Sequence, residues 1–196
     1  IMRVWVDVTE NAPSGTRYSK SVGCKDASDY CYNLYQSLGL DAEKQEWNPA
    51  DGPNVVGEIA GATNPEEIYI VTGHLDDLPS SGLAPGADDN ASGSVTVLEA
   101  ARVMACYSFR NTVRFLNVTG EEQGLNGSEA YSDRAYADGE DIRGVLNFDM
   151  NGWEGDGIPA VENMDVSYNS YSQWLAELFA ENAVTYQTGH VVDAFY

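Results

Sequence analysis

The alternation of apolar and polar residues predicts a series of β-strands from residue 43 onward. Two short stretches at 43–47 and 54–59 are joined by a cluster of Asn, Asp, Gly and Pro residues, which favours a β-hairpin. A β-branched run at 68–72 predicts the next strand, and a continuous apolar run at 113–118 is typical of a strand buried on both faces. A further short buried strand is expected at 145–148.

Apolar residues at helical spacing predict helices before, between and after these strands. The first is expected at 28–38, where Ser28 is a suitable N-cap and Gly39 a suitable end. The second is expected to cover about fourteen residues from Ser92. Two more helices are expected at 128–137 and 171–183.

The order of these elements predicts the fold class. From residue 68 strands and helices alternate, which argues for an α/β three-layer sandwich with a mostly parallel central sheet covered by helices on both faces. Residues 4–8 alternate apolar and polar side chains and are expected to form a first strand or an entry arm. A chain of 196 residues with 43% apolar content is expected to form one domain over 1–196.

The charge balance bears on the partners of the protein. Its 31 acidic residues against 10 basic ones give a formal charge of −21, which would repel nucleic acid phosphates and anionic lipid headgroups. No apolar run approaches the roughly 20 residues that a membrane helix needs. We therefore expect neither nucleic acid nor membrane as a partner, and such an acidic surface suits a secreted or salt-exposed protein.

Neither the cysteines nor the glycosylation sequons indicate a site. Cys24, Cys31 and Cys106 include no CxxC pair, so no thiolate metal site is suggested, and small buried or semi-exposed cysteines are favoured over a redox role. Asn-x-Ser/Thr sequons occur at Asn90 and Asn126 within turns discussed below, where a glycan would block the site, and a third occurs at Asn117.

Acidic and imidazole side chains follow the strands of the predicted parallel sheet. His74 follows one strand, Glu121 and Glu122 follow the next, and Asp149 ends the third, while Asp88 lies in the loop that returns from the first. Because ligands bind at the carboxyl ends of the strands in open parallel sheets, we expect these side chains to meet at one rim. One imidazole with several carboxylates suits Zn²⁺ or Mn²⁺.

Closely packed carboxylates argue for a bound cation. Two carboxylates at close range push one pKa upward, and a cation removes that difficulty. The alternative interpretation is that these are ordinary loop acids, in which Asp beside Gly and Asn reflects turn chemistry. That alternative is as good as the functional one for any single residue and much weaker for all the strand ends together.

Four motifs carry a resemblance to a known family. TGHLDD, PGADDNASG, TGEEQGLNGS and LNFDMNG, in that order, resemble the motifs of di-zinc aminopeptidases of the secreted bacterial leucyl type, a family that includes glutamate carboxypeptidase and glutaminyl cyclase relatives. The resemblance covers residues 54–152. It implies a zinc exopeptidase fold of the phosphorylase/hydrolase-like kind, two Zn²⁺ ions, peptide or protein N-termini as substrates, and a secreted, extracellular or periplasmic location.

The resemblance also implies a set of metal ligands. It assigns one zinc ion to His74, Asp88 and Asp149, and Asp88 would bridge to a second zinc ion held also by Glu122. Asp89 follows the bridging acid and would support the site from behind the ligands, in a family whose Asp–Asp peptide at this point is typically cis.

The same resemblance implies the catalytic residues. Glu121 matches the general base, which would take a proton from the attacking water and hand it to the departing amine. Asp76 matches the residue that fixes the imidazole of His74 and belongs with Glu121 to the catalytic set. Glu121 and Asp149 would also bind the substrate amine. The expected activity is that of a metallo-aminopeptidase, with a carboxypeptidase, a glutaminyl cyclase-like relative or a non-catalytic domain of the same fold as alternatives.

The chain departs from this family in two places. The family's sixth ligand is a histidine well after the last aspartate, and the later histidine of this chain, His190, has neither the motif nor the expected spacing. The chain also stops at Tyr196, before the last strands of such a sheet. We therefore expect the C-terminal segment to be absent and the second zinc site to be incomplete, either because the chain is part of a longer polypeptide or because one metal position is naturally impaired.

Overall fold

The computed structural model describes residues 15–78, 80, 85–152 and 163–196. Two compact units are formed, Ile1–Met150 and Asn151–Tyr196, and each is described by itself. The single domain expected from chain length stays a prediction. The first strand or entry arm expected at 4–8 lies outside the described residues.

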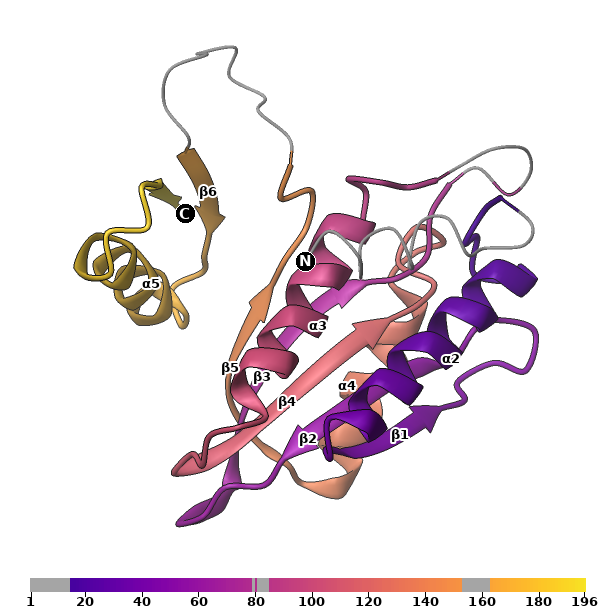
Figure 1. The fold of residues 1–196 in the computed structure, drawn as a ribbon, viewed down its shortest axis with the longest axis horizontal. Helices are drawn as coiled ribbons and strands as arrows, with labels where there is room; N and C mark the ends of the chain where they lie inside the picture. The colour runs from indigo at the N-terminus through magenta and orange to yellow at the C-terminus, as the bar shows by residue number, and fades with distance from the viewer. Residues whose placement is uncertain (1–14, 79, 81–84, 153–162) are drawn as a thin grey trace. The chain divides into compact units, whose positions relative to one another are not determined.

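The first unit is built on a five-stranded sheet in the order β1-β2-β4-β3-β5 (Figure 1). Strand β2 runs antiparallel to both β1 and β4, whereas β3 runs parallel to both β4 and β5. Four of the five strands therefore point the same way, and the predicted α/β fold with a mostly parallel sheet is confirmed. The strands are β1 (Asp41–Gln45), β2 (Asn54–Ile59), β3 (Asn64–His74), β4 (Asn111–Val118) and β5 (Asp141–Asn147).

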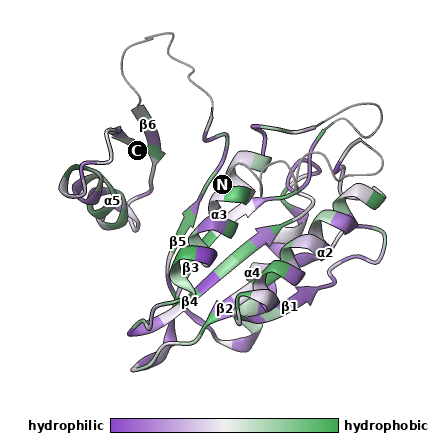
Figure 2. Ribbon diagram, viewed as in Figure 1, coloured by the Kyte–Doolittle hydropathy of each residue, from purple (hydrophilic) through white to green (hydrophobic). Residues whose placement is uncertain are grey.

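Three helices cover the two faces of this sheet. Helices α2 (Val22–Ser37) and α3 (Ala91–Met104) lie in front of it in Figure 1, and α4 (Asn126–Asp138) lies behind. One buried apolar cluster joins α2 and α3 to the sheet, and a second joins α4 to the other face. In Figure 2 the edge strand β1 is hydrophilic while the central strand β4 carries hydrophobic residues, as expected for a sheet buried at its middle.

Helix α2 begins earlier than the sequence predicts. Ser21 is its N-cap, and the side chain of Ser21 accepts a hydrogen bond from the Cys24 N–H at 3.0 Å. Ser28, predicted as the cap, is instead buried within the helix and donates to the Cys24 carbonyl at 3.1 Å. The prediction was wrong because the first turns bury small residues, which leave no large apolar residues at helical spacing. The end of the helix is as predicted, with Gly39 at φ +79°.

The second unit contains two strands and a helix. Strands β6 (Asn163–Ser167) and β7 (Val191–Phe195) pair in parallel, and α5 (Gln173–Thr185) joins them in sequence. The helix agrees with the prediction to within two residues, but neither β6 nor β7 was predicted. Within the part of the chain that the structure describes, every helix is too short or too polar to cross a membrane.

Candidate metal centre

Three potential metal ligands meet at the carboxyl end of the parallel strands. His74 ends β3, Asp89 lies just before α3, and Asp149 follows β5. His74 Nε2 lies 3.1 Å from Asp89 Oδ1 and 3.6 Å from Asp149 Oδ1. One ligand atom from each residue falls within 4.8 Å of the other two, and this is the one such group among the described residues. His74 and Asp149 therefore lie together at one rim, as expected from their positions at the ends of predicted parallel strands.

The structure brings Asp89 into this group where the sequence analysis had Asp88. The Asp88 backbone carbonyl accepts a hydrogen bond from the Ser92 hydroxyl at 2.8 Å. The cis peptide bond also lies one position later than expected, between Asp89 and Asn90. Consecutive side chains in a turn project in different directions, so the motif alone does not reveal which of two neighbouring aspartates faces the rim.

The ring of His74 is oriented by the residue two positions later. Its Nδ1 lies 3.1 Å from the backbone carbonyl oxygen of Asp76 and 3.7 Å from the Asp76 carboxylate. This contact leaves Nε2 directed at Asp89 and Asp149. A hydrogen bond from the second ring nitrogen is the usual accompaniment of a histidine metal ligand.

Asp76 also fixes the loop that carries the predicted catalytic base. It is fully buried, and its two carboxylate oxygens each accept a hydrogen bond at 3.2 Å, one from the Glu121 N–H and one from the Glu122 N–H. Glu121 Oε2 lies 3.9 Å from His74 Nε2. Glu122, predicted to hold a second zinc ion, lies outside the group of three.

The titrating groups of the rim influence one another strongly. Burial alone would lower the pKa of His74, but hydrogen bonds and charge from Asp149 and Asp76 raise this pKa from 6.5 to about 10. Burial raises the pKa of Glu121, an effect opposed by His74 and reinforced by Asp76. Burial also raises the pKa of Glu122. A cation at this rim would favour the charged forms of both glutamates and so oppose these two shifts.

A cavity of about 210 Å³ adjoins the group. It is lined by His74 and Asp149 of this group and by Glu121, and strand ends and the start of α4 complete its wall. Its lining residues are Thr72, His74, Val118, Glu121, Leu125, Ser128, Asn147 and Asp149.

The sequence analysis missed Asn90, noted there only as a sequon. It is fully buried, and its side-chain oxygen accepts a hydrogen bond from the Gly93 N–H at 2.8 Å as the N-cap of α3. An Asn directly before an apolar helical pattern is a recognised capping signal and could have identified it.

His190, the later histidine of the chain, is exposed in the second unit just before β7.

The donor set fits a divalent cation. One imidazole nitrogen and two carboxylate oxygens are the ligands that Zn²⁺ accepts, and Mn²⁺ accepts similar sets. Within the described ranges, no lysine or arginine forms an ion pair with Asp89, Glu121 or Asp149. Apart from the imidazole of His74, which these acids share, their negative charge is left for a ligand to balance.

Comparison with known proteins identifies the family. The sequence pattern of peptidase family M28 matches residues 54–195. The chain belongs to peptidase family M28. A probable leucine aminopeptidase of Trichophyton verrucosum (strain HKI 0517) is 36% identical over 156 residues, which are 72% of this chain and 42% of the relative. This M28 chain thus spans less than half the length of that curated relative.

Solved structures share the fold of this M28 chain. The LapA aminopeptidase of Legionella pneumophila matches with a TM-score of 0.82 at 23% identity, over 97% of this chain and 53% of LapA. BSAP, a zinc aminopeptidase from Bacillus subtilis, matches with a TM-score of 0.78 at 14% identity, over 98% of this chain and 79% of BSAP. The predicted resemblance to zinc aminopeptidases and the predicted fold class are confirmed.

Proposed function

We propose that this M28 peptidase is a zinc-dependent aminopeptidase that releases N-terminal residues from peptides and proteins. The observation that carries the proposal is the convergence of His74, Asp89 and Asp149 at one rim, with Glu121 beside them and a cavity adjoining. The printed names of its relatives, a probable leucine aminopeptidase and a zinc aminopeptidase, support the same activity.

In this proposal His74, Asp89 and Asp149 hold a zinc ion, and Asp89 replaces the Asp88 of the sequence analysis. A bound zinc ion supplies a Lewis acid that polarises a carbonyl and favours deprotonation of water. A second zinc ion held with the help of Glu122 stays a prediction. It would draw on the carboxylate of Glu122, whose backbone N–H donates to Asp76.

Glu121 is proposed as the general base. Its carboxylate lies near the rim, and burial brings its pKa closer to neutrality, where proton transfer in both directions is efficient. Glu121 would take a proton as the water oxygen bonds to the scissile carbonyl carbon. It would return that proton to the amine nitrogen as the C–N bond breaks. Asp76 contributes by holding the Glu121 backbone in place.

Two carboxylates of the rim suit the recognition of a free N-terminus. The side chains of Glu121 and Asp149 are 31% and 41% exposed, so a substrate ammonium can reach both. An ion pair between carboxylate and ammonium favours peptides with an unblocked amine. We also propose a secreted, extracellular or periplasmic location, which the formal charge of −21 supports.

The test is hydrolysis of leucyl-p-nitroanilide and of a short peptide by the zinc-loaded full-length protein. The proposal predicts release of the N-terminal residue and no reaction when the same peptide is N-acetylated. Release of the C-terminal residue from the acetylated peptide would indicate a carboxypeptidase. Stoichiometric zinc binding without hydrolysis of any of these substrates would indicate a non-catalytic domain.

A further inference from the structure

The candidate ligands differ in how the fold supports them. His74 belongs to β3 and is buried, whereas Asp89 and Asp149 lie in loops and their side chains are 49% and 41% exposed. Two carboxylates on separate loops repel each other, so their spacing requires a contact between the loops.

Asn90 makes that contact. Its side-chain N–H donates to the Phe148 carbonyl at 2.9 Å, and its side-chain oxygen accepts from the Met150 N–H at 3.3 Å. Asn90 directly follows Asp89, while Phe148 and Met150 are the two neighbours of Asp149. One buried amide thus bonds to the backbone on both sides of Asp149.

The position of Phe148 is fixed by its neighbours in the sheet as well. Its N–H donates to the Thr72 carbonyl at 2.8 Å, which continues the pairing of β5 with β3. The start of α3 approaches the Phe148 carbonyl so closely that a Cβ atom on Gly93 would lie 2.1 Å from that oxygen. Because glycine alone permits this approach, the Asn90 side chain can reach across to the loop after β5.

We propose that Asn90 is a positioning residue that holds the loop of Asp89 against the loop of Asp149 and so sets the spacing of the two carboxylates for a divalent cation. The inference rests on the proposed function, since it concerns the same metal centre. Ligands that are held at the coordinating distance before the ion arrives need less ordering on binding, and residues behind metal ligands typically contribute 10- to 100-fold to affinity.

Asn90→Ser separates this contribution from helix capping. Serine caps helices about as well as asparagine, so the bond to the Gly93 N–H can be kept. The serine side chain is too short to bond to both Phe148 and Met150. We expect Asn90→Ser in the full-length protein to retain most of the unfolding stability and to weaken binding of Zn²⁺ alone by about 10- to 100-fold, measured by calorimetric titration after chelator treatment.

Asn54→Ala is the matched control. Asn54 is equally buried, donates to the Gly127 carbonyl at 2.7 Å and accepts from the Thr119 N–H at 2.9 Å, but it bonds to neither loop of the group of three. We expect this variant to lower the unfolding stability and to bind Zn²⁺ like the wild type. Wild-type zinc affinity in Asn90→Ser would overturn the proposal, whereas a wild-type protein that binds no zinc would overturn the proposed metal centre itself.

A measurement on the unaltered protein covers the case in which Asn90→Ser fails to fold. The Met150 N–H should exchange with solvent at least about tenfold more slowly than an unprotected amide, because Asn90 accepts its hydrogen bond. Exchange of this amide at the unprotected rate in the folded, metal-free protein would also overturn the proposal.

Discussion

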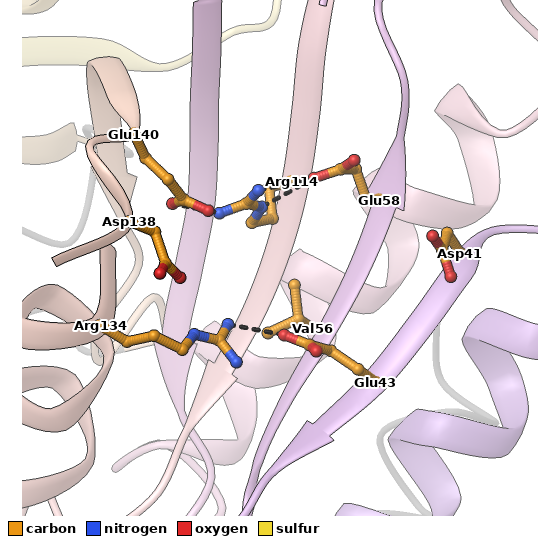
Figure 3. Close-up of a pocket in the computed structure, with 8 residues that line it drawn as sticks. All are labelled: Asp41, Glu43, Val56, Glu58, Arg114, Arg134, Asp138 and Glu140. Carbon is orange, nitrogen blue, oxygen red and sulfur yellow. Dashed lines mark hydrogen bonds and ion pairs between the residues drawn. The ribbon is translucent and has the colours of Figure 1, made fainter. Parts of the chain in front are cut away.

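Two clusters of carboxylates lie in the first unit, and they differ in their counter-charges. One is the metal-centre rim of His74, Asp89 and Asp149. The other surrounds a hollow of about 310 Å³, here called the arginine pocket (Figure 3). The arginine pocket is lined by Asp41, Glu43, Val56, Glu58, Arg114, Arg134, Asp138 and Glu140.

The arginine pocket contains its own cations. Arg114 contacts Glu58 and Glu140 at 2.7 Å each, and Figure 3 shows its guanidinium between the two carboxylates. Arg134 contacts Glu43 at 2.6 Å. The fold alone supplies cationic partners for Glu43, Glu58 and Glu140.

The rim has no arginine or lysine partner among the described residues. His74 is the group that its carboxylates share, and His74 Nε2 faces both Asp89 and Asp149. A cluster of carboxylates therefore does not by itself indicate a metal site. The informative feature is crowded acid beside an oriented imidazole, with no arginine or lysine paired to it in the part of the chain that is described.

Removal of the proposed general base should have the greatest effect on activity. Glu121→Gln removes the proposed base while keeping the size of the side chain, so kcat/KM for leucyl-p-nitroanilide should fall by about 100- to 10,000-fold. Zinc content should stay at the wild-type value, because Glu121 is not one of the proposed ligands. An unchanged rate would remove the peptidase assignment.

The next effect decides between two adjacent aspartates. Asp89→Asn should weaken zinc affinity by on the order of 100-fold or more, since loss of a ligand should exceed the effect of residues behind it. Asp88→Asn makes the same chemical change one residue earlier and should leave the affinity within about twofold of the wild type. The reverse order in a calorimetric titration would restore the assignment made from the motif.

Arg114→Met tests the other side of the comparison. The change leaves Glu58 and Glu140 without their cation, and breaking buried pairs costs about 3 to 5 kcal/mol. Because these glutamates retain 28% and 21% exposure, we expect a loss of about 2 kcal/mol of unfolding free energy. Denaturant unfolding measures this loss. A drop in zinc affinity instead would show that the two clusters are coupled.

The smallest effect is expected at the exposed edge of the arginine pocket. Arg134 and Glu43 are 33% and 53% exposed, so Arg134→Ala should change the unfolding free energy by only about 0.5 kcal/mol. The same denaturant titration suffices. A loss as large as that of Arg114→Met would mean that exposure does not govern the strength of these pairs.

Sequence patterns predicted the rim because the order of strands and helices determines which residues lie at one edge of the sheet. Parallel strands with acid or imidazole at their ends must bring those residues to one edge, and this placed His74 and Asp149 together before any coordinates. The choice of Asp88 over Asp89 depended on backbone torsions in a turn, which periodicity does not report. The cap role of Asn90 has a local signal, but its bonds to Phe148 and Met150 reach about 60 positions along the chain and leave no pattern there.

For the fold too, elements with a clear local sequence signal were predicted and elements without one were not. Strand β2 was predicted with its observed bounds because its apolar residues lie between clear turn signals. The start of α2 was misplaced by the small residues of its first turns, and β6 was missed because Asn163–Ser167 has only two apolar residues among polar ones. The arginine pocket could not be foreseen, since charged residues in separate elements show no pattern along the chain.

An anomalous difference map at the zinc absorption edge, from crystals of the full-length protein, tests the proposed ligand set. We predict a peak about 2.0–2.2 Å from His74 Nε2 and from carboxylate oxygens of Asp89 and Asp149. A zinc peak coordinated by Asp88 in place of Asp89, or stoichiometric zinc bound away from His74, would contradict it.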